Sequence, residues 1–190
     1  LVKVAELFAE SDYNFAGRPP LQCDLFSKKD NRKISLINIH MKCCDSGLNR
    51  RKKAAKMLYE YVDMQRNNNS DVGYIVLGDW NDDLKDLPNE HCFSEFLDND
   101  NYYFPTFDIT YDISQASYPK EPYVSFLDHI LTLSEMVSNV GFETIVFARP
   151  EKIHFESKRY AADDQYGLIN LDIPSYKKCQ PINTLKTTSP

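Results

Sequence analysis

The sequence has no long uninterrupted hydrophobic run. No apolar stretch approaches the roughly 20 residues that a membrane-spanning helix needs, so no membrane span is expected. The first residues, LVKVAELFAESDY, are too acidic and too short in apolar length for a signal peptide. Internal repeats and long low-complexity linkers are also absent. At 190 residues, the chain therefore has the size expected of one folded domain.

Positive charge is scarce. The chain carries 22 lysines and arginines against 28 aspartates and glutamates, which gives a formal net charge of -6. Because non-specific affinity for nucleic acid comes mainly from Lys and Arg, this balance excludes a protein that wraps nucleic acid with a uniformly basic surface. It does not exclude an enzyme that acts on phosphate esters, since a bound divalent cation reverses the local field.

Cysteine is present without a metal-binding framework. None of the five cysteines forms a CxxC pair, so a structural zinc site is not expected. Cys43 and Cys44 follow His40 closely and give the pattern HxxCC, which invites interpretation as a metal site. Successive side chains of a strand point to opposite faces, however, and this argues against a ligand shared by the two thiols.

The hydrophobic residues, 42% of the chain, fall into segments with strand or helix periodicity. Apolar runs predict strands over residues 34–42, 74–78, 126–133 and 142–148, and a shorter strand after the Pro19–Pro20 turn. Residues 50–66 place Ala54, Ala55, Leu58, Tyr61 and Val62 on one helical face, which predicts a surface helix packed on a sheet. A short helix over 92–100 and a long aromatic loop over 102–125 are also expected. This alternation predicts an α/β fold with a mixed sheet covered by helices.

Three of these strands end in residues that can do chemistry. They are Asn38 and His40, then Asp79 and Asn81, then Asp128 and His129. Taken singly, each is ordinary, because Gly, Asp and Asn all suit turns and a lone His at a strand end is commonly structural. Asp82 and Asp83, in the same GDWNDDL segment, are given turn and surface roles. Convergence of the three strand ends is the main sequence signal for a site.

Four segments together resemble the endonuclease/exonuclease/phosphatase superfamily in their order and spacing: INIHMK, RRKKAAKMLYEYV, YIVLGDWND and SFLDHILTL. The resemblance covers residues 2–133 and includes RPPL at the entry to the first of the matching strands. It implies a deoxyribonuclease I-like, four-layer α/β/β/α sandwich over residues 1–176, incomplete in this chain. Residues 177–190 have no periodicity, which predicts a tail. It also implies metal-dependent hydrolysis of a phosphodiester, with nucleic acid favoured as the substrate over lipid or inositol phosphate.

The resemblance assigns catalytic roles to four positions. His40 would donate a hydrogen bond to a phosphoryl oxygen as charge builds in the transition state. Asp79 would orient or deprotonate the attacking water, and Asn81 would hold both Asp79 and a phosphate oxygen. Asp128 would pair with a catalytic His nearer the C-terminus and fix its tautomer.

The resemblance also implies substrate and metal contacts. Arg18 would contact the substrate phosphate, since a guanidinium suits phosphate geometry. Apart from the resemblance, Arg50 and Arg51 in the basic RRKK run are further substrate-binding candidates, and a solvated helix face is the alternative interpretation of that run. The expected cofactor is Mg²⁺, or Mn²⁺ or Ca²⁺ in its place. Asp163 is the candidate metal ligand, because AADDQYGLINLDI is the closest counterpart of the family's closing Ser-Asp-His motif, with Asp164 where the His would stand.

Two parts of the family pattern have no counterpart in the sequence. These are the N-terminal half with its metal-binding Glu, and the closing catalytic His. A chain with these residues alone is expected to be poorly active. Two interpretations follow: a fragment whose other half comes from a second chain, or a degenerate relative that serves as a binding or structural module. A third interpretation is a plain structural domain in which the acidic turns are only turns.

Overall fold

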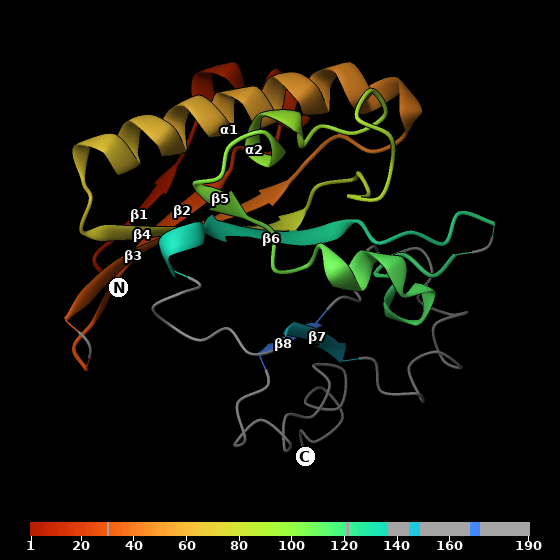
Figure 1. Cartoon of the computed structure of the whole chain (residues 1–190). Helices are drawn as coiled ribbons and strands as arrows, with labels where there is room; N and C mark the ends of the chain where they lie inside the picture. The colour runs from red at the N-terminus through yellow and green to blue at the C-terminus, as the bar shows by residue number, and fades with distance from the viewer. Residues whose placement is uncertain (30, 121, 137–144, 149–167, 172–190) are drawn as a thin grey trace, which may run out of the picture.

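The computed structural model describes residues 1–29, 31–120, 122–136, 145–148 and 168–171 (Figure 1). Its elements, in chain order, are the following: β1 (Lys3–Glu6), η1 (Ala9–Phe15), β2 (Leu21–Ser27), β3 (Arg32–His40), η2 (Asp45–Gly47), α1 (Leu48–Asn68), β4 (Val72–Asp79), α2 (Ser94–Leu97), β5 (Tyr102–Tyr103), η3 (Asp108–Tyr111), η4 (Ile113–Gln115), β6 (Asp128–Leu133), β7 (Ile145–Ala148) and β8 (Leu168–Leu171). The elements marked η are short 3-10 helices.

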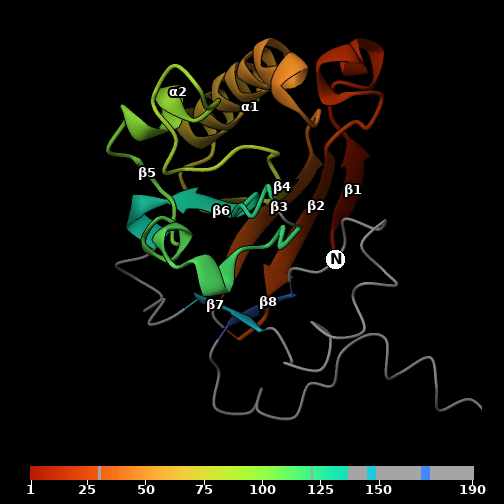
Figure 2. The same cartoon turned by 90° about the vertical axis from the view of Figure 1, so that its right-hand side faces the viewer.

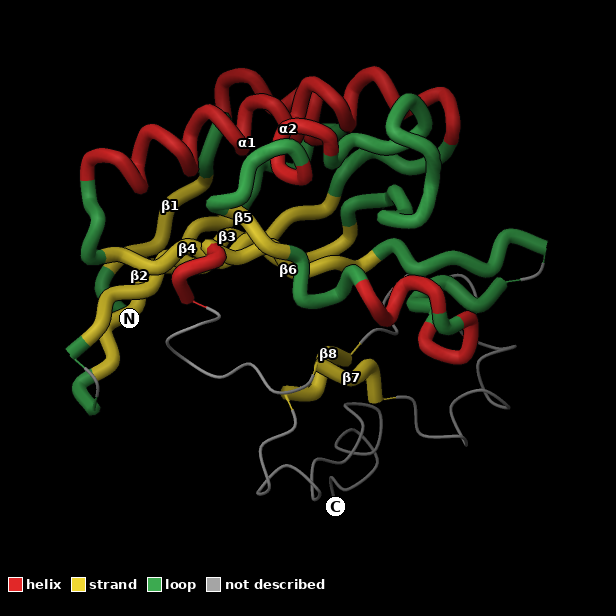
Figure 3. Tube along the Cα trace, in the orientation of Figure 1, coloured by secondary structure: helices red, strands yellow, loops and turns green. Residues whose placement is uncertain are grey.

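Six of the strands form one mixed sheet, in the order β1-β2-β3-β4-β6-β5. Strands β3 and β4 run parallel, and every other neighbouring pair in this sheet is antiparallel. The parallel pair needs a crossover, and α1 supplies it. The predicted mixed sheet is therefore confirmed. Strands β7 and β8 form a separate antiparallel pair, which lies on the side of the large sheet opposite α1 (Figures 1 and 3).

Helix α1 covers one face of the large sheet, as the sequence periodicity predicts (Figure 2). Its buried side chains include Ala54, Ala55, Leu58 and Val62, and it runs slightly beyond the predicted range at both ends. The sheet residues that this face presents are apolar and buried, among them Ile37 and its register partner Val76 on β4. Burial of these residues between helix and sheet supplies the main hydrophobic stabilisation of the domain.

Trp80 is the centre of an aromatic cluster at the end of β4. Its ring centroid lies 5.3 Å from that of Phe93, 5.9 Å from Phe96 and 5.8 Å from Phe104. Phe96 comes from the predicted short helix, now α2, and Phe104 from the segment predicted as a long loop. That segment, 102–125, contains β5 and two short 3-10 helices but otherwise follows the expected irregular path.

The α/β fold class predicted from the sequence is confirmed by this mixed, helix-covered sheet. The described residues show one such α/β layer pair, not the whole four-layer sandwich. No helix among them is long and apolar enough to cross a membrane. The predicted tail over 177–190 and the candidate ligand Asp163 lie outside the described residues.

Candidate functional site

His40, Asp79 and Asp128 lie side by side in one row across three adjacent strands. In the parallel pair, His40 on β3 is in register with Asp79 on β4; in the antiparallel pair, Asp79 is in register with Asp128 on β6. Residues in register share a face, and alternation from buried Ile39 places this row on the face opposite α1. The strand ends expected to converge are thus brought together by strand register.

Within this strand-end row, defined as His40, Asp79 and Asp128, the first two side chains are in direct contact. His40 Nε2 lies 3.4 Å from Asp79 Oδ2. The His40 side chain is 41% exposed, whereas that of Asp79 is 14% exposed. Asp79 is therefore partly withdrawn from water, and the imidazole beside it is reachable by a ligand from solvent.

Gly78 allows β4 to approach β3 closely just before Asp79. Its φ of +127° is a conformation that residues with a side chain rarely adopt. A Cβ placed there would lie 2.2 Å from the backbone oxygen of Ile39. The glycine of the GDWN segment is therefore required by the geometry that sets Asp79 beside His40.

Asn81 closes the turn after β4 in a left-handed conformation, with φ of +52°. Its backbone N–H donates to Asp79 Oδ1 at 2.8 Å, and its side-chain Nδ2 donates to the carbonyl oxygen of Met41 at 3.1 Å. Trp80, between the two polar residues, is fully buried and anchors the turn in the aromatic cluster. Trp80 thus fixes the turn in the core, while the Asn81 N–H holds the Asp79 carboxylate in place.

The Met41 carbonyl joins the turn to a third element. Besides the bond from Asn81, it accepts a hydrogen bond from Arg18 Nη2 at 2.7 Å. Arg18 is an exposed residue in the segment that enters β2. Sequence reasoning missed this role of Met41, because a backbone oxygen leaves no signal in the residue type.

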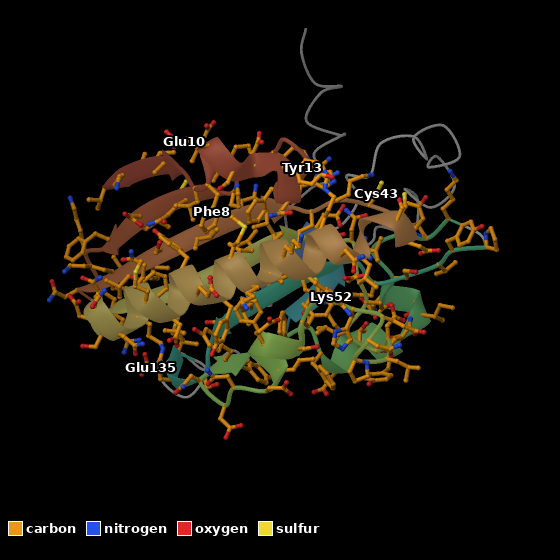
Figure 4. The ribbon with its side chains drawn as sticks, turned by 90° about the horizontal axis from the view of Figure 1, so that it is seen from above. Phe8, Glu10, Tyr13, Cys43, Lys52 and Glu135 are labelled. Carbon is orange, nitrogen blue, oxygen red and sulfur yellow. The ribbon has the colours of Figure 1, made fainter. Side chains whose placement is uncertain are left out.

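The other two predicted substrate-binding arginines have protein partners. Arg50 donates to the carbonyl oxygen of Tyr13, and its guanidinium carbon lies 4.0 Å from the centroid of the Tyr13 ring. Figure 4 shows Tyr13, from η1, at the end of the molecule where α1 begins. Arg51 is buried, and its Nη2 donates to Asp82 Oδ1 at 2.6 Å.

Asp82 and Asp83 do not have the turn and surface roles predicted from the sequence. Both are buried, with exposures of 4% and 3%. Burial raises the pKa of Asp82, although the hydrogen bond and charge of Arg51 oppose this shift. The prediction was wrong because the partner of Asp82 comes from a distant part of the chain, where local composition gives no indication of it.

Asp83 fastens the aromatic loop to the end of the sheet. Its Oδ2 accepts a hydrogen bond from the backbone N–H of Phe126 at 3.1 Å, and its Oδ1 accepts one from Thr110 Oγ1. Lys85 Nζ lies 2.9 Å from Asp83 Oδ2. The loop therefore has a fixed path into β6, immediately before Asp128.

His129, next to Asp128 in sequence, lies on the opposite face and does not join the row. It is fully buried, with Nδ1 3.1 Å from Thr106 Oγ1 and Nε2 3.1 Å from the carbonyl oxygen of Asp82. Burial lowers the pKa of His129 to about 4. The side chain is therefore neutral at pH 7. Through Asp82 and Thr106 it links the turn after β4 to the 102–125 segment.

A complete metal site is not found among the described side chains. No group of three or more His, Cys, Asp or Glu in the described ranges is placed to hold a metal ion. Mg²⁺ prefers a near-octahedral set of oxygen ligands, and the carboxylates of Asp79 and Asp128 alone do not provide it. The described residues therefore do not fit the cofactor that the resemblance implies unless further donors are added.

No family model and no curated protein matches the chain. Solved structures do resemble it. The catalytic domain of human Nocturnin with a bound sulfate anion is 18% identical, with a TM-score of 0.49, over 70% of this chain and 48% of that one. An endonuclease/exonuclease/phosphatase family protein from Bacteroides thetaiotaomicron is 17% identical, with a TM-score of 0.41, over 60% and 40%.

A third similar structure is D. rerio TDP2 complexed with single-strand DNA product. It is 16% identical, with a TM-score of 0.46, over 78% of this chain and 57% of that one. The chain thus spans about half the length of the solved proteins that it resembles. At these identities and TM-scores, the likeness assigns no activity to this chain.

Proposed function

We propose that the chain is part of a phosphodiester hydrolase that acts on nucleic acid, with the strand-end row as its reaction centre. The observation that carries the proposal is the register of His40, Asp79 and Asp128 on the sheet face opposite α1. Hydrolysis of a phosphodiester needs a base for water and a donor for the developing oxyanion. Adjacent carboxylate and imidazole groups supply both.

In this proposal, Asp79 orients and deprotonates the attacking water. The hydrogen bond from the Asn81 N–H holds the carboxylate in place. His40, 3.4 Å away, donates to the phosphoryl oxygen, and Asp128 orients a further group at the other edge of the row. Arg18 is the best placed of the three arginines for a phosphate because it is exposed, with its Nη2 bonded to the Met41 carbonyl, whereas Arg50 stacks on Tyr13 and Arg51 is buried.

Nucleic acid is the proposed substrate because the segment that leads into β6 carries exposed aromatic rings. Tyr103, Tyr111 and Tyr123 are 40%, 64% and 72% exposed. Exposed aromatic rings provide surfaces on which unpaired bases stack, at roughly 1–3 kcal/mol per base. A small inositol phosphate has no flat apolar face to use them.

A divalent cation, Mg²⁺ in this proposal, would offset the repulsion between two carboxylates and an anionic diester. Its remaining ligands must come from outside the described residues, either from Asp163 and its surroundings or from a second chain.

Plasmid nicking tests the proposal. Supercoiled DNA is incubated with the purified protein in Mg²⁺, after chelation with EDTA, and after Mg²⁺ is added back. We expect nicking in Mg²⁺, loss in EDTA and recovery on addition, with replacement of His40 by Gln lowering the rate at least about 100-fold. Nicking that is equally fast in His40→Gln contradicts the proposed role of the row.

A binding module is the second candidate, and the missing third metal donor among the described side chains favours it. Such a protein would retain single-stranded DNA in a fluorescence anisotropy titration without cleaving it. Tyr123→Ala would weaken this binding, whereas His40→Gln would leave it unchanged. Binding without any Mg²⁺-dependent nicking would select this candidate over the hydrolase.

A further inference from the structure

Cys43 and Cys44 place their thiols together just beyond β3. The thiol of Cys44 donates to Cys43 Sγ at a sulfur–sulfur distance of 2.9 Å. This contradicts the expectation from strand alternation. Strand β3 ends at His40, and Cys44 has a φ of +70°, so the alternating geometry no longer applies. Both cysteines are free thiols in this structure.

Side chains from three other segments hold the backbone from Met41 to Cys44, which carries this dithiol. Arg51 Nη1 donates to the carbonyl oxygens of both Lys42 and Cys44, at 2.9 Å and 2.7 Å. The carbonyl of Met41 accepts the bonds from Arg18 and Asn81 described above. The Cys44 carbonyl also accepts from the Gly47 N–H at 2.8 Å. Little conformational freedom is therefore lost when a ligand joins the two sulfurs.

The dithiol is accessible and lies beside positive charge. Cys44 is exposed and Cys43 is partly exposed. Figure 4 shows Cys43 near the end of the molecule where α1 begins. Lys42 Nζ donates to Cys43 Sγ at 3.4 Å. The hydrogen bond from Cys44, together with that from Lys42, lowers the pKa of Cys43 and favours its thiolate, whereas the same contact raises the pKa of Cys44.

We propose that Cys43 and Cys44 form a chelating site for a soft, thiophilic ion, of which trivalent arsenic is the representative. Thiolates select soft ions over the hard Mg²⁺ proposed for the strand-end row. Two sulfurs on adjacent residues bind such a centre in a single ring that is closed through the backbone of Cys43 and Cys44. With phenylarsine oxide, the arsenic–oxygen bond breaks and two arsenic–sulfur bonds form. The oxygen leaves as water with the two thiol protons, and no oxidant or reductant is consumed.

The other described cysteines do not offer this geometry. Cys23 is a partly buried residue of β2, and Cys92 is buried, with its pKa raised well above the usual value by burial. Neither has a sequence neighbour that is a cysteine. Cys23 therefore serves as the matched single-thiol control, together with Cys179, which lies outside the described residues.

Intact-mass spectrometry tests the site on protein first reduced with a phosphine, which leaves no competing thiol. We expect one phenylarsine adduct per chain that survives excess mercaptoethanol and is removed by a dithiol. Trypsin cleaves after Lys42 and Arg50, so the adduct should map to the single peptide CCDSGLNR. Cys43→Ser and Cys44→Ser should each weaken capture roughly 100-fold or more, because the second thiol no longer acts intramolecularly.

Cys23→Ser and Cys179→Ser should capture the arsenical as the unaltered protein does. Circular dichroism of each variant verifies that the fold is retained, and Cys44→Ser is the more informative of the two site variants because Cys44 is exposed. A stable adduct that persists in Cys44→Ser, or no dithiol-reversible adduct on the reduced protein, overturns the proposal. Neither readout depends on phosphodiester cleavage.

Discussion

Four consecutive residues, Gly78, Asp79, Trp80 and Asn81, each meet a different physical demand. Gly78 supplies a backbone conformation and a close contact, and Trp80 supplies a buried anchor. Asn81 supplies the hydrogen bond that steadies the Asp79 carboxylate. At the scale of single residues, the GDWN segment therefore holds the Asp79 carboxylate on the sheet face opposite α1.

The first prediction concerns Gly78. Gly78→Ala should lower the free energy of unfolding by about 2–4 kcal/mol, because the new Cβ meets the Ile39 backbone and the left-handed region strains any residue with a side chain. Gly73→Ala, in the same strand, is the control, since its Cβ meets only the flexible end of Met136. Urea denaturation measures both. Equal losses in the two variants would argue against a special conformation at Gly78.

The second prediction concerns His129. Burial lowers its pKa from 6.5 to about 4, so between these values the unfolded chain takes up a proton that the folded chain refuses. This group therefore makes the folded state less stable as pH falls through that window, by up to about 1.4 kcal/mol per pH unit. Urea denaturation at pH 7 and pH 5 should give a smaller pH-dependent loss in His129→Gln than in the unaltered protein. An equal loss in both would contradict the neutral, buried state of His129.

At the scale of secondary-structure elements, local periodicity predicted the parts of the fold that are long and regular. The buried face of α1 and the apolar runs of β3, β4 and β6 were all visible in the sequence. Strand β1 was not predicted, because its four residues, KVAE, are mostly exposed and have no apolar alternation. It is a strand because it pairs with β2.

The same limit applies to the candidate site. The three strand ends carried chemical residues that sequence order could identify, and strand register then set them in one row. The burial of Asp82 and Asp83 depends on Arg51 and Phe126, which lie 31 and 43 positions away in the chain. Local pattern carries no information on such contacts. The approach of Cys43 to Cys44 likewise depends on a backbone conformation that residue type does not predict.

The third prediction concerns the element that Asp83 holds. Asp83→Ala should lower the free energy of unfolding by roughly 2–4 kcal/mol, because it leaves the buried N–H of Phe126 without its acceptor and removes the bond to Thr110. Hydrogen exchange should show faster exchange over residues 104–120. Asp112→Ala is the control, since Asp112 is exposed and bonds only within its own short turn to Ser114. Equal exchange in both variants would exclude an anchoring role for Asp83.

At the scale of the whole molecule, the two faces of the sheet differ in character. One is buried under α1 (Figure 2). The other carries the strand-end row at one end. That second face also presents apolar positions in register, including Val4, which is 50% exposed, and its partner Cys23. A domain whose fold is a sandwich of two sheets buries such a face against the second sheet. The partly exposed apolar positions on the face opposite α1 therefore support the proposal that further residues or a second chain complete the site.

The most direct test of the central claim is the rate of Mg²⁺-dependent phosphodiester cleavage by Asp79→Asn, compared with Asp71→Asn. The two aspartates lie at opposite ends of the β4 region, and Asp71 is exposed and paired with Lys33 at 2.8 Å. We predict that Asp79→Asn loses at least about 100-fold in initial rate with its unfolding curve preserved, because a general base is worth that much or more. Asp71→Asn should retain the full rate. Equal rates in the two variants would contradict the account.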